Sequence, residues 1–425
     1  MYENFSYGNK IKEVVKQIED KIKPVHWEVD KIVEKNQYRV LESFRNQNVA
    51  DFHFNPSTGY GYDDTGRDTL EKVYAEVFGA EAGLVRPQII SGTHAISLSL
   101  FGVLRPGDEL LYITGRPYDT LEEIVGIRGN QNGSLKEFNI SYQTVPLTEV
   151  GEVDFPSVSK AIKPNTKLIG IQRSKGYATR PSLTIEQIQE MIRFVKEIKP
   201  DVLVFVDNCY GEFVEELEPS HVGADLVAGS LIKNPGGGLA KTGGYIVGKE
   251  ALVEQCAYRL TAPGLGREAG ASLYSLLEMY QGFFLAPHIV GQALKGAIFT
   301  SALLEEYGFN TYPKWNQKRT DLIQSVQFHN REMMIAFCQA IQFASPVNAH
   351  VRPEPSYMPG YEDDVIMAAG TFIQGASIEL TADGPMRPPF EAYVQGGLTY
   401  EHVKIALITA INQLMEKQLI NENPC

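Results

Sequence analysis

The sequence has few cysteines and no long hydrophobic run. Four cysteines occur among 425 residues and none forms a CxxC pair, which is too sparse for a disulfide scaffold. No run of about 20 apolar residues is present to span a membrane. The N-terminal segment lacks the apolar core of a signal peptide. These features lead us to expect a cytoplasmic protein without a membrane span.

Signals for metal and nucleotide chemistry are also scarce. The eight histidines form neither an HExxH motif nor pairs with metal-ligand spacing, so we expect no metal site. The stretch GGGLAKTGG resembles a P-loop, but that motif needs glycine where Pro235 and Ala240 stand. A formal net charge of −13 repels phosphate backbones. Nucleic acid is therefore not an expected partner, and a small molecule is.

The length and composition predict a globular protein with two packed domains. Hydrophobic residues make up 43% and charged residues 21%, as in ordinary globular proteins. We expect a helical arm at residues 1–55, a large domain at 56–290 and a small C-terminal α+β domain at 291–425.

Short apolar segments alternate with amphipathic ones through the predicted large domain. We expect strands at residues 83–90, 109–113, 167–171, 202–206, 226–228 and 245–247, and helices at 69–78, 95–104, 121–125 and 185–198. Unalternating apolar strands separated by helices indicate a mostly parallel α/β sheet covered on both faces. Outside this domain we expect helices at residues 8–48, 268–306 and 400–417. Thr371 to Leu380 is the strongest strand candidate of the last third.

Two ionisable residues follow neighbouring strands of this predicted sheet. Asp207 ends the strand VFVD, and Lys233 follows the strand DLVAGS. Ligands of open α/β sheets bind at the carboxyl ends of strands. A lysine can form a Schiff base with an aldehyde cofactor such as pyridoxal 5'-phosphate (PLP), and a buried aspartate favours protonation of the PLP ring nitrogen. A salt-bridged or capping Asp207 with a solvated Lys233 is the alternative for these two residues alone.

Small polar residues and one aromatic residue could complete such a site. Ser91, Gly92 and Thr93 lie between a strand and a helix, where free N–H groups and the helix dipole favour a phosphate. Ser230 could add a hydroxyl group. Tyr118 follows the strand ELLYI and could stack on a planar ring. Taken singly, the serines and threonine could equally be helix caps, and Tyr118 could pack in a loop.

The order of these motifs resembles one branch of the fold-type-I PLP enzymes. SGTHAI, a tyrosine-containing loop, VDNCYGEF and SLIK occur in the order of the Cys/Met-metabolism enzymes, which include cystathionine lyases and methionine gamma-lyase. TGYGYDDTGRDTLEKVYAEVFGAEAGLVR, SLIKNPGGGLAKTGGYIVG and ELTADGPMRPPFEAYVQGGLTYEH are similar to the bacterial "aluminium resistance" or cystathionine beta-lyase-like family. The resemblance runs from about residue 50 to the end of the chain.

The resemblance implies a role for each cofactor residue. Lys233 would carry the cofactor and move protons, Asp207 would pair with the ring nitrogen, and Tyr118 would stack on the ring. The phosphate would be held by Ser91, Gly92, Thr93 and Ser230. Lysine has an ordinary pKa of about 10.4, so base work near pH 7 requires the site to lower it.

Three further residues take roles from the resemblance. Tyr62 would reach the phosphate of a neighbouring subunit, and Arg387 would bind the substrate α-carboxylate through its bidentate guanidinium. The better-known lyases carry an arginine two residues after the tyrosine, whereas Asp64 stands here, so Arg67 could take over that contact. Cys209 replaces a threonine of the lyases and is interpreted as a packed small side chain.

The implied activity is that of a carbon–sulfur lyase. The expected substrate is a sulfur amino acid of the cystathionine, cysteine or methionine type, cleaved by β- or γ-elimination. A homodimer or homotetramer is implied, with active sites at subunit contacts. The alternative is a PLP-binding protein of the same fold with another amino-acid substrate, or with a regulatory or stress role without lyase turnover.

Overall fold

The computed structural model describes residues 1–178, 180–358 and 361–422, and it divides into two compact units. One contains Met1–Lys35 and Ala286–Cys425, and the other Asn36–Leu285. Helices α1 (Gly8–Asn46) and α8 (Leu276–Glu306) contribute residues to both units. These units follow other boundaries than residues 55 and 290, and the functional division into arm, large domain and small domain stays a prediction.

The unit at residues 36–285 contains a seven-stranded sheet. Its spatial order is β1-β7-β6-β5-β4-β2-β3. The strands are β1 (Ala82–Arg86), β2 (Glu109–Tyr112), β3 (Ser141–Thr144), β4 (Thr166–Gln172), β5 (Leu203–Asp207), β6 (Leu226–Ser230) and β7 (Gly244–Gly248). Only β7 runs antiparallel to its neighbours. This is the mostly parallel sheet that the sequence predicts.

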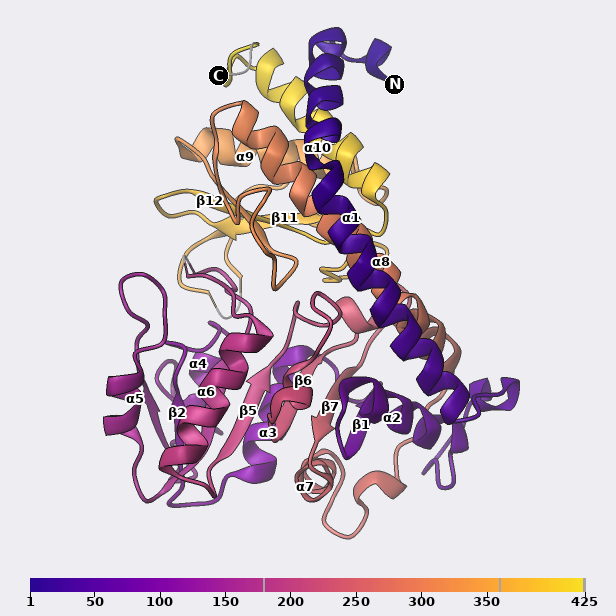
Figure 1. The fold of residues 1–425 in the computed structure, drawn as a ribbon, viewed down its shortest axis with the longest axis vertical. Coiled ribbons are helices and arrows are strands. Elements are labelled where there is room, and N and C mark those ends of the chain that lie inside the picture. The colour runs from indigo at the N-terminus through magenta and orange to yellow at the C-terminus, as the bar shows by residue number, and fades with distance from the viewer. Residues whose placement is uncertain (179, 359–360, 423–425) are drawn as a thin grey trace. The chain divides into compact units, whose positions relative to one another are not determined.

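Helices cover both faces of this sheet. They are α2 (Thr65–Phe78), α3 (Gly92–Val103), α4 (Leu121–Val125), α5 (Phe155–Ala161), α6 (Ile185–Ile198) and α7 (Glu250–Leu260). Figure 1 shows α6 in front of the sheet and α3 behind it. Leu226 and Ala228 of β6 belong to the core under α3 and α7, whereas Val227 between them is buried toward the opposite face. Burial on both faces explains why the strands read as unbroken apolar runs.

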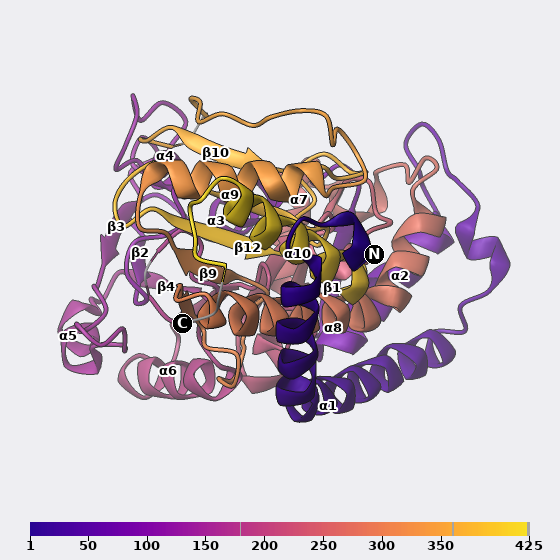
Figure 2. The same cartoon turned by 90° about the horizontal axis from the view of Figure 1, so that it is seen from above.

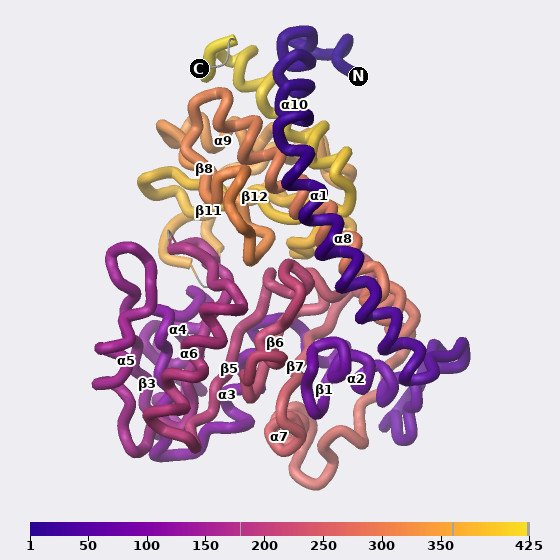
Figure 3. The backbone as a smooth tube through the Cα atoms, in the orientation of Figure 1, coloured from indigo at the N-terminus to yellow at the C-terminus, as the bar shows by residue number. Residues whose placement is uncertain are grey.

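The other unit holds a five-stranded antiparallel sheet of order β10-β11-β12-β9-β8. Its strands are β8 (Asn310–Tyr312), β9 (Gln324–Gln327), β10 (Val365–Ala368), β11 (Thr381–Pro385) and β12 (Glu391–Gln395), and its helices include α9 (Arg331–Phe343) and α10 (Tyr400–Glu416). Figure 2 shows α9 beside α10. The start of α1 lies beside the end of α10 (Figure 3), where Tyr7 N donates to Asn412 Oδ1 at 3.1 Å.

One predicted strand is wrong. Thr371 to Leu380 forms turns, and the strand begins only at Thr381. The Glu379 carboxylate accepts hydrogen bonds from Phe372 N and Ile373 N at 2.8 and 2.9 Å, which bends the chain back on itself. Gly375 has a φ of +77°, a conformation that glycine adopts without strain. In the described ranges no helix is both long and apolar enough to cross a membrane.

Candidate active site

Four predicted site residues lie at one edge of the seven-stranded sheet. Asp207 ends β5 opposite Ala228 of β6, and Ser230 ends β6. Arg86, which ends β1, and Ser230 are both paired with Gly244 of β7, so β1 and β6 end at the same level. Helix α3 begins six residues after β1, with Ser91 as its N-cap and Gly92 as its first residue. The strand ends thus supply the edge at which open α/β sheets bind ligands.

The first turn of α3 packs closely against the turns after β5 and β6. A Cβ atom on Gly92 would lie 3.1 Å from Cys209 Sγ and 3.3 Å from Ser230 Cβ. Ser91 Oγ accepts from His94 N at 3.0 Å, and Thr93 Oγ1 lies 3.1 Å from Thr120 Oγ1. Glycine is therefore the residue that lets Ser91, Thr93 and Ser230 gather around the helix N-terminus, where an anion would be favoured.

Asp207 is a buried acid with a nearby cation. Its carboxylate Oδ1 accepts from Cys209 N at 3.1 Å, and the side chain is 5% exposed. Burial raises the pKa of Asp207, while attraction to Lys233 and the hydrogen bond from Cys209 act against that increase. Burial also raises the pKa of the Cys209 thiol well above its ordinary value. Cys209 is thus a packed, protonated thiol at neutral pH, as the sequence suggested, and not a nucleophile.

Lys233 lies directly before the short helix η4 (Asn234–Gly236), with Nζ 3.9 Å from the centre of the Tyr210 ring. Burial lowers the pKa of Lys233, but attraction to the ionised forms of Cys209, Tyr210, Asp207 and Glu212 outweighs burial and raises the pKa overall. The protein's own groups therefore act opposite to the lowering that base work requires. Because Asp207 is one of these groups, the proton affinity of Lys233 depends on whether Asp207 faces another cation.

Tyr118 lies in the loop between β2 and α4 and packs against the core below α3. Its ring is 6.1 Å from that of Tyr177. A Cβ atom on Gly176 would come within 2.9 Å of Tyr118 Cδ2. Since Thr120 contacts Thr93, the Tyr118 loop is held beside the first turn of α3. The predicted stacking residue and phosphate residues thus belong to one structural cluster.

Tyr62 and Arg67 have contrasting surroundings at the start of α2. Tyr62 is 54% exposed and stacks on Tyr60 at 5.3 Å. Arg67 is buried: Nη1 donates to the carbonyl oxygens of Gly61 and Gly270 at 2.6 and 3.1 Å, and Nε donates to Asp68. Through these contacts Arg67 stabilises the loop that carries Tyr62. The role of Arg67 in binding phosphate stays a prediction.

Arg387 belongs to the other compact unit, after β11. Its Nη1 lies 2.8 Å from Asp363 Oδ2, and the side chains are 48% and 37% exposed. A carboxylate from a substrate would compete with Asp363 for the same guanidinium. The substrate-binding role of Arg387 stays a prediction.

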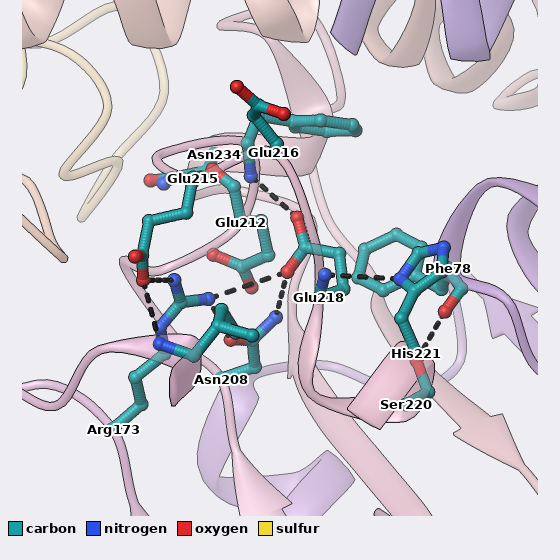
Figure 4. Close-up of polar contacts among 12 residues, drawn as sticks. Phe78, Arg173, Asn208, Glu212, Glu215, Glu216, Glu218, Ser220, His221 and Asn234 are labelled. Carbon is teal, nitrogen blue, oxygen red and sulfur yellow. Dashed lines mark hydrogen bonds and ion pairs between the residues drawn. The ribbon is translucent and has the colours of Figure 1, made fainter. Parts of the chain in front are cut away.

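A buried polar network below the site was not predicted. Arg173 donates from Nη1 to Asn208 Oδ1 at 2.8 Å and from Nη2 to Glu215 Oε2 at 2.9 Å. Its Nη1 also lies 3.4 Å from Glu218 Oε2 (Figure 4). Arg173 N donates to the carbonyl oxygen of Asp207 at 3.0 Å. The network fixes the turn that follows Asp207. In the sequence, the acidic residues of GEFVEELEP are the feature that could have indicated this network.

These residues fit PLP. Gly92 lets the N-terminus of α3 approach Ser230 closely, where N–H groups and the hydroxyl would favour a phosphate, Asp207 is a buried carboxyl group for a ring nitrogen, and Lys233 supplies the amine. The three features occur on adjoining turns at one sheet edge. The donor set therefore has the chemistry that each part of the cofactor requires.

Comparisons with known proteins agree with this fit. The methionine gamma-lyase family model matches residues 11–415. L-methionine gamma-lyase of Pseudomonas putida is 30% identical over 208 residues, covering 48% of this chain and 45% of that protein.

Solved structures extend the similarity over almost the whole chain. A carbon–sulfur lyase involved in aluminum resistance from Clostridium novyi is 47% identical with a TM-score of 0.92, covering 96% of each chain. A Bacillus cereus protein is 75% identical with a TM-score of 0.93, covering 95% of this chain and 99% of the other. The expected fold type, PLP dependence and lyase class are confirmed by the family match. The chain belongs to the methionine gamma-lyase family.

Proposed function

We propose that this protein cleaves a carbon–sulfur bond of an amino acid of the cystathionine, cysteine or methionine type, with Lys233 as the reacting amine. The observation that carries the proposal is the adjacency of Gly92, Ser230, Cys209 and the Asp207 turn at one sheet edge, with Lys233 three residues beyond Ser230. The family match and the name of the Clostridium relative support the reaction class.

Each residue has a separate task in this proposal. When bound, PLP supplies an aldehyde for Schiff-base formation and a ring that withdraws electrons. The hydroxyl groups of Ser91, Thr93 and Ser230 and the N–H groups at the start of α3 bind its phosphate. Asp207 would favour protonation of the ring nitrogen, and Tyr118 would stack on the ring.

Lys233 links cofactor binding to proton transfer. Its Nζ would hold the cofactor, and as a free amine the same Nζ would remove the proton from the substrate α-carbon. With Asp207 paired to the ring nitrogen, less negative charge is left to hold Lys233 as an ammonium ion, and its pKa falls toward a value useful for a base. Lys233 or Tyr118 then protonates the departing sulfur, while Arg387 holds the substrate carboxylate.

The test is a visible absorption spectrum of the purified holoenzyme before and after addition of sulfur amino acids, with assays for pyruvate and 2-oxobutyrate. A band of the lysine-bound cofactor that shifts, with pyruvate formed, identifies β-elimination; 2-oxobutyrate identifies γ-elimination. A cofactor band that never shifts favours the binding protein without lyase turnover. Absence of a band after PLP addition contradicts the proposal.

We further propose a cytoplasmic homo-oligomer in which Tyr62 serves the site of a second subunit. The support is an exposed surface that includes Tyr60, Tyr62, Leu273 and Tyr274. Leu273 N donates to Ser57 O at 3.1 Å, so the two segments that carry these side chains are joined. Apolar surface of this kind is typical of subunit contacts.

Mixed oligomers test this arrangement. Lys233→Ala and Tyr62→Ala are each expected to be much less active than the wild type. If Tyr62 acts across the contact, co-refolded mixtures regain about a quarter of wild-type activity, since half of randomly paired dimers contain one intact site. No regain in mixtures shown to contain hybrids would place Tyr62 outside a partner's site.

A further inference from the structure

Glu212 is a carboxyl group buried close to Lys233 to which the proposed reaction assigns no task. It lies in the turn that follows β5, and it is 0% exposed. Tyr245 Oη donates to its Oε1 at 2.8 Å, whereas Oε2 is buried without a hydrogen-bond partner. Within the described ranges no cation forms an ion pair with Glu212. A buried ionised carboxylate normally requires such a partner.

The main chain of the same residue holds the turn that carries Lys233. Asn234, which directly follows the lysine, donates from Nδ2 to the carbonyl oxygen of Glu212 at 2.9 Å. Figure 4 shows Glu212 and Asn234 next to the network around Arg173. A Cβ atom on Gly229 would lie 2.5 Å from Glu212 Oε1, so the carboxyl group packs closely against the end of β6. Glu212 therefore touches three elements that determine where Lys233 lies.

We propose that Glu212 is a positioning residue for Lys233 that is an uncharged carboxylic acid at neutral pH. Its main chain fixes the Lys233–Asn234 turn and its side chain fixes Tyr245, while Asp207 remains the ionised acid that the lysine faces. The role of Glu212 in positioning Lys233 rests on the proposed function, whereas its protonation state does not. A second carboxylate beside Lys233 would hold the ammonium form and oppose its use as a base.

The electrostatic surroundings agree with this assignment. Burial, together with repulsion from Glu218, raises the pKa of Glu212 to about 8, although its own backbone N–H, the Tyr245 hydrogen bond and Lys233 lower it. The other titratable groups facing it are Tyr74 from α2 and Cys209 from the same turn. Arg173 is engaged by Glu215 and Glu218.

The sign of the pH effect follows from linkage. The folded pKa of Glu212 lies above its ordinary value of 4.5. The stability that the buried acid contributes is fully present below pH 4.5 and is lost as the pH rises through about 8. Glutamine keeps the shape and cannot ionise, so Glu212→Gln removes this loss.

The first experiment measures thermal unfolding of the PLP-free protein at pH 6 and pH 9. The melting temperature of Glu212→Gln minus that of wild type is expected to rise by about 3 °C between the two pH values. Glu216→Gln, an exposed acid of the same turn, should show no such rise. A difference that is independent of pH overturns the proposal, because it would mean that Glu212 does not change charge in this range.

The second experiment titrates the visible band of the PLP-loaded protein. Wild type and Glu212→Gln are expected to coincide at pH 6.5 and to separate above pH 8, where wild-type Glu212 acquires charge beside Lys233. Separation already at pH 6.5 overturns the proposal. If wild type shows no band, the proposed function fails while the melting experiment still tests Glu212.

Tyr245→Phe keeps the proposal testable if Glu212→Gln does not fold. Loss of the hydroxyl donor raises the pKa of Glu212 further, so the fall in melting temperature should continue to higher pH than in wild type. An unchanged profile between pH 7 and pH 9 would contradict the assignment.

Discussion

Lys233 and Arg387, the two basic residues of the proposed reaction, occupy opposite kinds of surroundings. Lys233 follows a strand buried on both faces, next to acids that strongly change its proton affinity. Arg387 lies at the surface in an ion pair with Asp363, with 48% of its side chain exposed. Exposed ion pairs are worth only about 0–1 kcal/mol. The amine proposed to react is thus buried, while the guanidinium proposed to bind substrate lies at the surface with a partner that is easily exchanged.

The strongest test of this contrast is Lys233→Ala. We expect loss of the visible cofactor band and a decrease in turnover of more than about 10³-fold, since general acid–base catalysis alone contributes about 10²- to 10⁴-fold. Lys241→Ala is the matched control, because Lys241 is 72% exposed and pairs with Glu278 at 2.5 Å. Spectra and steady-state rates distinguish the two lysines. Loss of the band in Lys241→Ala instead would move the reacting amine to that residue.

The buried region around Lys233 contains the Arg173 network, which Arg173→Met should break. Glu215 and Glu218 would then lose the cation they share, although Glu218 would keep its 3.9 Å contact with Arg39. Removing one partner of a buried pair costs about 3–5 kcal/mol. Chemical denaturation of the PLP-free protein measures the loss.

Arg45→Met is the control for that variant. Arg45 is 66% exposed and pairs with Glu42 within α1, so its replacement should change stability by less than about 0.5 kcal/mol. Equal losses in the two variants would show that the Arg173 network adds no more than a surface pair.

The compact units that carry Lys233 and Arg387 also differ in how well the sequence predicted their strands. The apolar runs that became β5 and β6 were readable because parallel strands are buried on both faces. β3 (Ser141–Thr144) was missed, since an edge strand with exposed polar residues lacks that signal. In the other unit, Thr371 to Leu380 is apolar enough for a strand, but a hydrogen-bonded side chain, Glu379, bends it.

The candidate site was predicted from motifs whose spacing is local. Asp207, Ser230 and Lys233 could be placed because each directly follows a recognisable strand. The tasks of Arg173 and Glu212 could not be inferred in the same way. They depend on which distant side chains meet in the fold, such as Glu212 with Tyr245, 33 positions away. Pairing and protonation of buried acids are tertiary properties.

For the exposed Arg387, replacement by alanine (Arg387→Ala) should weaken substrate binding while the cofactor band remains. A hydrogen bond to a charged group contributes about 1.5–3 kcal/mol, which predicts an increase in KM of about 10- to 150-fold. Steady-state kinetics and the visible spectrum of the same preparation measure the two effects separately. Loss of the band with unchanged KM would give Arg387 a cofactor or structural role.

The smallest and most specific effect is expected for Asp363→Ala. Because Asp363 and the substrate carboxylate would compete for Arg387, removing the aspartate should lower KM by about 1.5- to 5-fold, which corresponds to the 0.2–1 kcal/mol of an exposed pair. The effect should vanish in the Arg387→Ala background, so a double-mutant cycle isolates it from general changes in surface charge. Increasing ionic strength should shrink it, since both side chains are exposed. A KM that rises in Asp363→Ala would mean that the pair orients Arg387 for substrate instead of competing with it, and the contrast between a buried lysine and an exchangeable arginine would then fail.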